Sequence, residues 1–221
     1  DSYLDKAIEG FVMFALNQGE VCTCPSRALV HEDIADKFLE LAIERVKKIK
    51  IGHPLDTETM MGAQASTEQM NKIQSYLELG PQEGAEVLTG GERLELPGDL
   101  ADGYYVKPTV FANVTNDMTI ARQEIFGPVL SIIPFDTEEE AIALANDTPF
   151  GLISYVFTQG LDRGLRVSEA LEAGMVGLNQ GVVSNPAAPF GGIKESGVGR
   201  EGGFTGIDEF LETKYIGVRM G

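Results

Sequence analysis

Two cysteines separated by one residue, Cys22 and Cys24, are the side chains of this sequence best suited to covalent chemistry, and the chain has no others. A metal site needs three or four ligands, and the chain adds only His31 and His53, at no zinc-like spacing. We therefore expect no metal. A disulfide across one intervening residue closes a strained ring and would be a reducible switch. From spacing alone, two buried and unreactive thiols are the favoured interpretation.

The loop around the cysteines keeps a second interpretation open. Gly19 and Pro25 bracket the pair between a helical pattern that runs to about Leu16 and a strand that begins near Ala28. A thiol on such a loop can face a ligand while its own backbone N–H points the same way. Nucleophilic attack on a carbonyl requires this combination, a thiolate and a donor for the developing oxyanion.

A glycine pattern near the end of the chain has a different meaning. Residues 197–202 read Gly-Val-Gly-Arg-Glu-Gly, which matches the GxGxxG string of dinucleotide-binding folds. That fingerprint needs a strand directly before it and a helix that opens within it. Here it follows "PAAPFGGIKES", a loop-like segment. We interpret these glycines as turn and packing residues.

The elements that must position these residues follow from apolar periodicity. In chain order we expect a helix to about residue 16, a strand at 28–30, helices at 33–49 and 66–79, strand segments at 103–111 interrupted at Pro108, a strand at 129–135, a helix at 138–146, a strand at 152–158, a helix at 162–173 and a strand at 174–179. Asp33 and Ser66 are candidate N-caps, and Thr137 with Glu140 forms a capping box. The regular alternation after residue 128 indicates an α/β fold with a mostly parallel sheet.

The C-terminal segment 206–220 reads as a short helix followed by an alternating strand, Lys214–Met220. A terminal strand of this kind can pair with another subunit as well as with its own sheet. The glycine-rich stretch 181–206 is the least regular part of the sequence, and loops of this length are commonly functional.

Composition excludes several classes of function. The 221 residues carry 17 basic and 34 acidic side chains, a net charge of −17, which argues against binding to nucleic acid phosphates. No apolar run approaches the roughly 20 residues that cross a bilayer, and two cysteines fit a reducing compartment. We expect a cytoplasmic protein without membrane contact. Because the chain begins at Asp1 inside a helical pattern, we also expect that an N-terminal portion precedes it.

Three segments, in order over nearly the whole chain, resemble a known family. "FALNQGEVCTCPSRALVHE" (14–32) resembles the nucleophile segment of NAD(P)-dependent aldehyde dehydrogenases, whose core is G-[QE]-x-C. "QEIFGPVLSII" (123–133) resembles the family's E-x-F-G-P-V segment, and "PFGGIKESGVGRE" (189–201) its P-F-G-G-x-K-x-S-G-x-G-R-E loop. Together the three segments are highly specific.

The resemblance implies roles for individual residues. Cys22 matches the catalytic nucleophile, and its backbone N–H would supply part of the oxyanion hole. Glu124 matches the carboxylate that binds the nicotinamide ribose, and Phe126 the ring beside the nicotinamide. Gln69 and Lys72 fall where the family contacts the adenosine ribose. The implied cofactor is NAD or NADP.

The resemblance also implies the architecture. We expect a three-layer α/β/α catalytic domain of the aldehyde dehydrogenase fold over 1–205 and a helix–strand oligomerisation segment over 206–221. The strand would join a homodimer or homotetramer. Phe190 matches an aromatic residue of the aldehyde tunnel, and Asn179 and Gly181 lie where a strand becomes the tunnel wall.

The substrate assignment divides the chain. Residues 1–64 look like acetaldehyde-type enzymes, whereas residues 174–221 look like succinate-semialdehyde dehydrogenases, with Ser184 at a position that contacts the substrate carboxylate. The arginine that such enzymes often carry six residues before the nucleophile is Leu16 here. Because this loses a charge-assisted partner, we favour a short-chain aliphatic aldehyde over succinate semialdehyde.

The implied reaction oxidises an aldehyde to a carboxylic acid through a cysteine thiohemiacetal and a thioester. The family's cofactor-binding domain, its base and the asparagine of its oxyanion hole normally precede this region, so we expect the 221 residues alone to be inactive. The alternative class is a non-catalytic oligomerising domain that kept the scaffold. Some succinate-semialdehyde enzymes resemble this chain in having C-x-C, so Cys24 is a candidate redox partner of Cys22.

Overall fold

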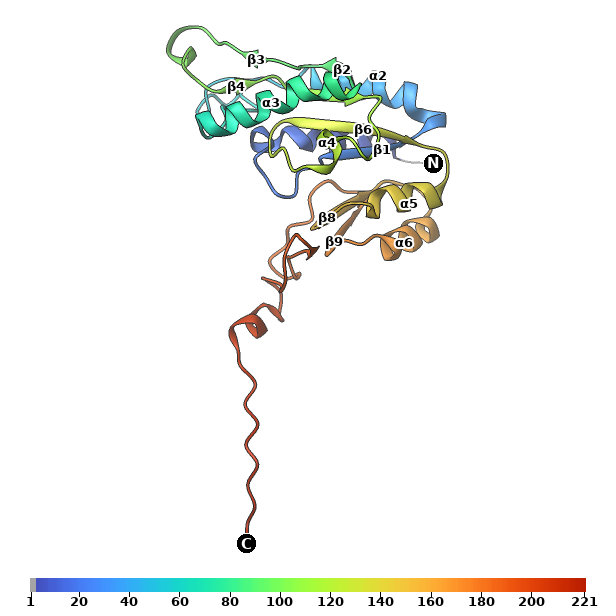
Figure 1. The fold of residues 1–221 in the computed structure, drawn as a ribbon, viewed down its shortest axis with the longest axis vertical. Helices are drawn as coiled ribbons and strands as arrows, with labels where there is room; N and C mark the ends of the chain where they lie inside the picture. The colour runs from blue at the N-terminus through green and yellow to red at the C-terminus, as the bar shows by residue number, and fades with distance from the viewer. Residues whose placement is uncertain (1–2) are drawn as a thin grey trace.

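The computed structural model describes residues 3–221, and its centre is a four-stranded sheet (Figure 1). The strand order is β1 (Arg27–His31), β6 (Val129–Phe135), β5 (Thr109–Ala112) and β2 (Glu86–Thr89). The β1–β6 and β5–β6 pairs are parallel, and the β2–β5 pair is antiparallel. The predicted strands over 28–30, 103–111 and 129–135 are confirmed, including the interruption at Pro108.

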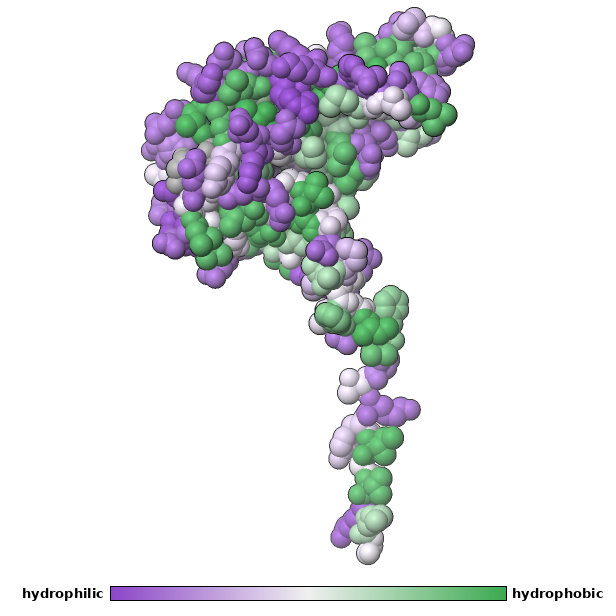
Figure 2. Space-filling view, turned by 180° about the vertical axis from the view of Figure 1, so that it is seen from behind, coloured by the Kyte–Doolittle hydropathy of each residue, from purple (hydrophilic) through white to green (hydrophobic). Residues whose placement is uncertain are grey.

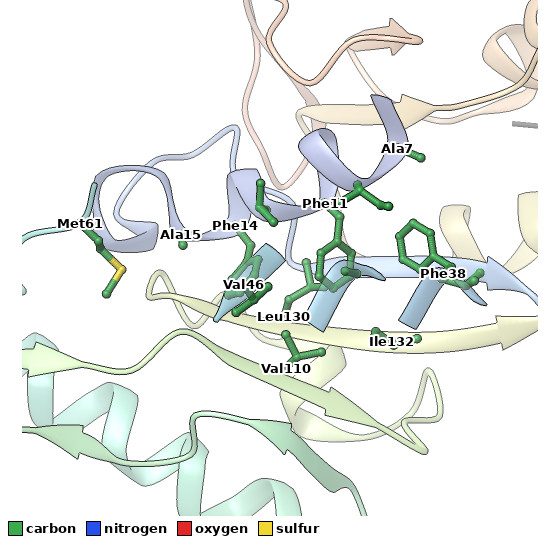
Figure 3. Close-up of a cluster of buried hydrophobic side chains, with 14 residues drawn as sticks. Ala7, Phe11, Phe14, Ala15, Phe38, Val46, Met61, Val110, Leu130 and Ile132 are labelled. Atoms are coloured by element: carbon green, nitrogen blue, oxygen red, sulfur yellow. The ribbon is translucent and has the colours of Figure 1, made fainter. Parts of the chain in front are cut away.

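One face of this sheet packs against the N-terminal helices. These are α1 (Leu4–Val12), the 3-10 segment η1 (Met13–Gly19) and α2 (Ala35–Val46). Figure 3 shows Phe11 and Phe14 pointing toward Val110 and Leu130 of the strands, and all four are at least 95% buried. Because side chains alternate along a strand, their neighbours in β5 and β6 must face the other way.

The opposite face packs against α3 (Thr67–Glu83) and α4 (Thr119–Arg122). Phe111 and Val129 of the strands join Met70, Ile73 and Ile120 of the helices in a second buried cluster. Two separate clusters on the two faces make the three-layer α/β/α arrangement that the sequence predicts.

A second, smaller sheet follows in the chain. From β6 the chain runs through α5 (Glu138–Asn146), β8 (Ile153–Val156), α6 (Leu161–Ala170) and β9 (Met175–Leu178), and β8 pairs with β9 in parallel. The predicted elements over 138–178 therefore form, but β8 does not continue the sheet of β6. Between α5 and β8 lies β7 (Phe150–Gly151), which pairs antiparallel with β10 (Ile193–Lys194) in a separate two-stranded sheet.

The remaining elements are short. They are β3 (Arg93–Leu94), which pairs antiparallel with β4 (Tyr105–Val106), and the 3-10 segments η2 (Glu32–Ile34), η3 (Gly98–Leu100) and η4 (Gly206–Phe210).

Helix caps agree with the sequence at two of three places. The Ser66 hydroxyl accepts the Gln69 N–H at 3.2 Å at the start of α3, and the Thr137 hydroxyl accepts the Glu140 N–H at 3.2 Å at the start of α5. In a capping box the Glu140 carboxylate would accept the N–H of Thr137. Here it accepts the N–H of the preceding residue, Asp136, at 2.8 Å.

The third cap prediction, Asp33, is wrong. The segment begins with η2, where the ring nitrogen Nδ1 of His31 accepts the Asp33 N–H at 3.1 Å, and α2 starts only at Ala35. The first helix is also shorter than expected. α1 ends at Val12, and η1 contains non-helical backbone from Leu16 onward.

Beyond η4 the chain runs away from the body as an exposed tail, residues 211–221 (Figure 1). Apolar side chains alternate along it and are uncovered (Figure 2), with Tyr215 91% and Met220 89% exposed. Within the described chain no strand forms in this tail, so the strand expected over 214–220 is not confirmed. No helix in residues 3–221 is long and apolar enough to cross a membrane.

Candidate active site

The two cysteines lie on one loop, residues 17–24, here called the cysteine loop, and they differ in exposure. The Cys22 side chain is exposed, whereas Cys24 is partly buried, and both are free thiols. Within residues 3–221 no hydrogen bond or ion pair engages the Cys22 thiol, and none uses its backbone N–H. Cys22 therefore presents a thiol and an unpaired donor to the surroundings.

Cys24 is held as a hydrogen-bond donor. Its Sγ donates to the backbone carbonyl of Met13 at 3.1 Å, with the Leu16 carbonyl at 3.6 Å. Burial raises the pKa of Cys24 to about 11, so the thiol keeps its proton at neutral pH. Because the thiolate is the reactive form, the structure separates the two cysteines into one accessible and one sequestered thiol.

The backbone before Cys22 is strained and fastened. Asn17 and Gln18 have positive φ values of 46° and 53°, a conformation that costs Gln18 roughly 1–2 kcal/mol and Asn17, whose residue type adopts it more readily, less. The Gln64 amide donates to the Gln18 carbonyl at 3.2 Å, and the Glu20 carboxylate accepts the Ala65 N–H at 3.0 Å. These contacts to residues 64–65 hold the loop in its strained shape.

A glycine joins the cysteine loop to the second motif. Gly19 has φ +78°, and a Cβ there would lie 2.1 Å from the carbonyl carbon of Gly127 and 2.4 Å from the nitrogen of Pro128. Only glycine allows so close an approach of two backbones. The loop that bears Cys22 is thus packed directly on residues 124–127, here called the EIFG loop.

The EIFG loop is held by α3. The Lys72 ammonium donates to the Glu124 carbonyl at 2.9 Å, and the Gln69 amide donates to the Phe126 carbonyl. Phe126 has φ 59°, so the Gln69 bond fastens another strained residue. A Cβ at Gly127 would lie 2.5 Å from Cδ1 of Ile73, which seats the end of the loop on the same helix.

The structure therefore brings together the four residues for which the sequence predicts cofactor contacts. Gln69 and Lys72 bind the loop's backbone carbonyls, a role that sequence reasoning did not include. The Glu124 carboxylate is exposed, and no described residue donates to it.

A groove of about 160 Å³ lies beside the cysteine loop. Its lining residues are uncharged: Met13, Leu16, Asn17, Val21, Thr23, Cys24, Gly181, Val182 and Ser184. The structure thus places the predicted substrate residues Leu16 and Ser184 in one groove, next to both sequence neighbours of Cys22.

Two predicted tunnel residues lie outside this groove. The backbone of Phe190 pairs with that of Glu201 in two hydrogen bonds of 2.7 and 2.9 Å, and its ring does not line the groove. Asn179 uses its side-chain amide to hold both backbone groups of Thr158, at 2.9 and 2.8 Å.

Sequence reasoning missed Tyr155 of β8. Its hydroxyl donates to the Thr23 carbonyl, in the peptide between Thr23 and Cys24, at 2.9 Å. The two residues are 132 positions apart, and Tyr155 reads as an ordinary strand residue, so only the fold reveals the contact.

The glycine pattern 197–202 opens no helix, as its interpretation as turns requires. The Arg200 guanidinium donates to the carbonyls of Gly192 at 2.6 Å and Gly199 at 2.8 Å, and the Glu209 carboxylate accepts the Arg200 N–H at 3.2 Å. No group of three or more potential metal ligands gathers anywhere in residues 3–221.

Residues 1–216 match the model of the aldehyde dehydrogenase family. The chain belongs to this family. Acetaldehyde dehydrogenase 2 of Cupriavidus necator is 56% identical over 216 residues, which are 98% of this chain and 42% of that protein. A long-chain-aldehyde dehydrogenase of an Acinetobacter species is 53% identical over 216 residues, again 98% of this chain and 42% of that protein. The chain thus spans about two fifths of the length of these relatives.

Solved structures of aldehyde dehydrogenases share the fold. Betaine aldehyde dehydrogenase of Staphylococcus aureus, in complex with NAD+, superposes with a TM-score of 0.94 at 41% identity, over 98% of this chain and 43% of that one. The P. syringae indole-3-acetaldehyde dehydrogenase, a mutant in complex with NAD+ and IAA, superposes with a TM-score of 0.91 at 44% identity, over 96% of this chain and 42% of that one. These likenesses support the α/β fold with a mostly parallel mixed sheet.

Proposed function

We propose that this chain is the nucleophile-bearing part of an enzyme that oxidises an aldehyde to a carboxylic acid with NAD or NADP. The observation that carries the proposal is the exposed Cys22 thiol with its unpaired backbone N–H, beside an uncharged groove. Family membership supports it, as do relatives named for acetaldehyde and long-chain aldehydes.

In the proposed reaction, Cys22 loses its thiol proton to solvent and the thiolate adds to the aldehyde carbon. The carbonyl oxygen becomes an oxyanion, which the backbone N–H of Cys22 stabilises. The hydrogen on that carbon leaves as hydride, which produces a thioester on Cys22. Water then adds to the thioester and releases the acid and the free thiol.

The EIFG loop fits a nicotinamide ribose. The exposed Glu124 carboxylate offers two acceptor oxygens to a sugar diol, and Phe126 offers a ring on a backbone that Gln69 fixes. When bound, NAD(P)+ supplies the hydride acceptor. The Gly19–Gly127 contact keeps this loop beside the loop that bears Cys22.

The test compares the two cysteines in the complete enzyme. Cys22→Ser should lower the rate of NAD(P)H formation from acetaldehyde by at least about a thousandfold, because the nucleophile is lost. Cys24→Ser keeps a donor toward the Met13 carbonyl and should lower the rate less than about tenfold. An undiminished rate in Cys22→Ser would contradict the proposed nucleophile and favour the non-catalytic alternative.

The groove favours a short, uncharged aldehyde. No charged side chain lines it, and Leu16, 42% exposed, stands where an arginine would bind a substrate carboxylate. Succinate semialdehyde is the second candidate because Ser184 lies in the same groove.

Leu16→Arg separates these two substrates. The new guanidinium should raise kcat/KM for succinate semialdehyde by about tenfold or more relative to acetaldehyde. Leu16→Gln, which is polar but uncharged, serves as the control and should leave the ratio near that of the wild type. A wild-type enzyme that already prefers succinate semialdehyde would contradict the assignment.

We further infer that the tail pairs with a second copy of the chain. Tyr215, Ile216 and Val218 are each more than 70% exposed, an arrangement that favours burial against a partner. Light scattering should show a smaller oligomer after removal of residues 212–221. An unchanged mass would contradict the inference.

A disulfide between Cys22 and Cys24 remains a proposal for regulation. It requires Cys24 to leave its bond to the Met13 carbonyl. Intact mass after peroxide treatment should show the loss of two hydrogens. Stable free thiols under the same treatment would contradict it.

A further inference from the structure

Tyr155 connects the smaller sheet to the peptide between Thr23 and Cys24, one residue beyond the proposed nucleophile. The residue lies on β8, whereas the cysteine loop packs through Gly19 on Gly127 and Pro128, directly before β6 of the larger sheet. Its hydroxyl donates to the Thr23 carbonyl at 2.9 Å. This is the contact by which β8 fixes the position of a backbone group next to Cys22.

The surroundings of Tyr155 are built to hold its ring. Gly177 stands opposite it on β9, and a Cβ at Gly177 would lie 2.8 Å from Cδ1 of the ring. Gly177 does not have a positive φ, so its backbone conformation is open to other residues. A side chain at this position would instead occupy the space that the Tyr155 ring fills. The strand pair therefore leaves the ring only limited freedom to move.

The protonation of Tyr155 matches the role of a donor. Burial, with smaller contributions from the neighbouring Cys24 and Cys22, raises the pKa of its hydroxyl to about 12, although the hydrogen bond to Thr23 acts in the opposite direction. The phenol therefore keeps its proton at neutral pH and can donate to the Thr23 carbonyl without interruption.

Three consecutive residues of the cysteine loop are held in different ways. The Thr23 carbonyl is bound by Tyr155, and the Cys24 thiol is bound by the Met13 carbonyl. Cys22 itself has no hydrogen bond within the described chain. Fixing the two residues after Cys22 determines where its thiol and its N–H point, while both groups stay free for a ligand.

We propose that Tyr155 is a positioning residue for the nucleophile: its hydroxyl, bound to the Thr23 carbonyl, keeps Cys22 accessible and Cys24 sequestered. The proposal rests on the proposed role of Cys22 as nucleophile. It assigns to β8 a contribution to the reaction that acts through the loop, without contact to the aldehyde.

The test measures alkylation of each thiol in the complete enzyme. Iodoacetamide at neutral pH labels the thiols, and peptide mass spectrometry gives separate rates for Cys22 and Cys24. In wild type we expect Cys22 to react much faster. In Tyr155→Phe, which lacks only the hydroxyl, the Cys22-to-Cys24 ratio of rates should fall about three- to tenfold, the range expected for one hydrogen bond.

Tyr104→Phe is the matched control, because it removes a hydroxyl that accepts a 2.7 Å hydrogen bond from Thr67, at the start of α3. It should leave the ratio unchanged. Tyr155→Met, which fills much of the space without a hydroxyl, should reproduce the fall. A general loosening of the fold would expose the partly buried Cys24 and also lower the ratio, so the free energy of unfolding of each variant is measured in urea. A fall in the ratio in Tyr155→Phe but not in Tyr104→Phe, at an equal free energy of unfolding, distinguishes positioning from lost stability.

The outcomes separate this inference from the proposed function. Equal rates for both thiols in wild type would overturn Cys22 as the nucleophile, and the positioning role with it. A wild-type preference for Cys22 that persists unchanged in Tyr155→Phe and Tyr155→Met would overturn the positioning role alone.

Discussion

The cysteine loop and the EIFG loop touch each other, yet they are supported in different ways. The cysteine loop is held from several distant parts of the chain, including Gln64 and Tyr155. The EIFG loop is held by one helix, through Gln69, Lys72 and Ile73 of α3.

This difference shows how the chain divides two tasks. A nucleophile must stand in one place relative to an oxyanion donor, and contacts from several directions fix a loop in all dimensions. A loop that receives a ligand needs its backbone shape fixed, while the Glu124 carboxylate stays free. Substitutions in the two sets of supports should therefore have different consequences.

Gly19→Ala should have the largest effect because it breaks the contact between the loops. The new Cβ would lie 2.1 Å from a backbone carbon, at a φ of +78°. We expect a loss of about 3 kcal/mol in the free energy of unfolding, measured in urea. Gly98→Ala is the control, since Gly98 has φ +65° and no atom within 4 Å, and it should cost only about 1 kcal/mol. Equal losses would contradict the importance of the contact.

The pH dependence of Cys24 alkylation tests whether this thiol is sequestered in the cysteine loop. Burial raises the pKa of Cys24 from 9.0 to about 11, so at neutral pH the folded chain should hold about 100-fold less Cys24 thiolate than the unfolded chain. Alkylation of Cys24 should be slowed accordingly and should recover as the pH approaches 11.

The raised pKa of Cys24 also makes the free energy of unfolding depend on pH. Between pH 9.0 and about 11 the unfolded thiol loses its proton while the folded thiol keeps it. The stabilisation is therefore complete below pH 9.0 and is lost as the pH rises toward 11. Cys24→Ala should lack this part of the alkaline decline. Identical pH curves for the two proteins would contradict it.

Gln69→Ala should weaken the EIFG loop with a smaller effect. It removes the donor to the carbonyl of the strained Phe126, and we expect a loss of about 1 kcal/mol. Hydrogen exchange should quicken at residues 124–127 but not in the cysteine loop. Gln82→Ala, on the exposed surface of the same helix, should change neither quantity. Faster exchange in both loops would show that Gln69 supports the cysteine loop as well as the EIFG loop.

Lys72→Met should have the smallest effect. Its ammonium donates to the Glu124 carbonyl from an exposed position, so we expect about 0.5 kcal/mol. Lys48→Met removes an equal charge from an exposed lysine without a side-chain partner in residues 3–221 and serves as the control. A loss of several kcal/mol would mean that the two α3 bonds act as one unit.

Local chemistry made part of this molecule predictable from sequence. Ser66 and Thr137 cap the helices that they were expected to cap, because an N-cap depends on residues only three positions apart. The continuous apolar run 129–135 forms β6 in the middle of the sheet, where both faces are buried. The motif segments identified the family.

The rest depends on contacts between distant residues. His31 caps the segment in place of Asp33 because its ring nitrogen accepts the N–H of Asp33 itself, so the first turn begins two residues earlier than expected. β8 pairs with β9 and lies in a different sheet from β6, and β7, which precedes β8, pairs with β10 more than 40 positions away. The Tyr155–Thr23 bond has no sequence signal at all, since neither residue type requires the other.

One run of ten residues, 64–73, supports both loops. Its first two residues hold the cysteine loop, and Gln69, Lys72 and Ile73 hold the EIFG loop. Because the run is continuous, a displacement of its residues pulls both loops in the same direction. This shared support limits how much the distance between the two loops, on which hydride transfer in the proposed reaction depends, can change.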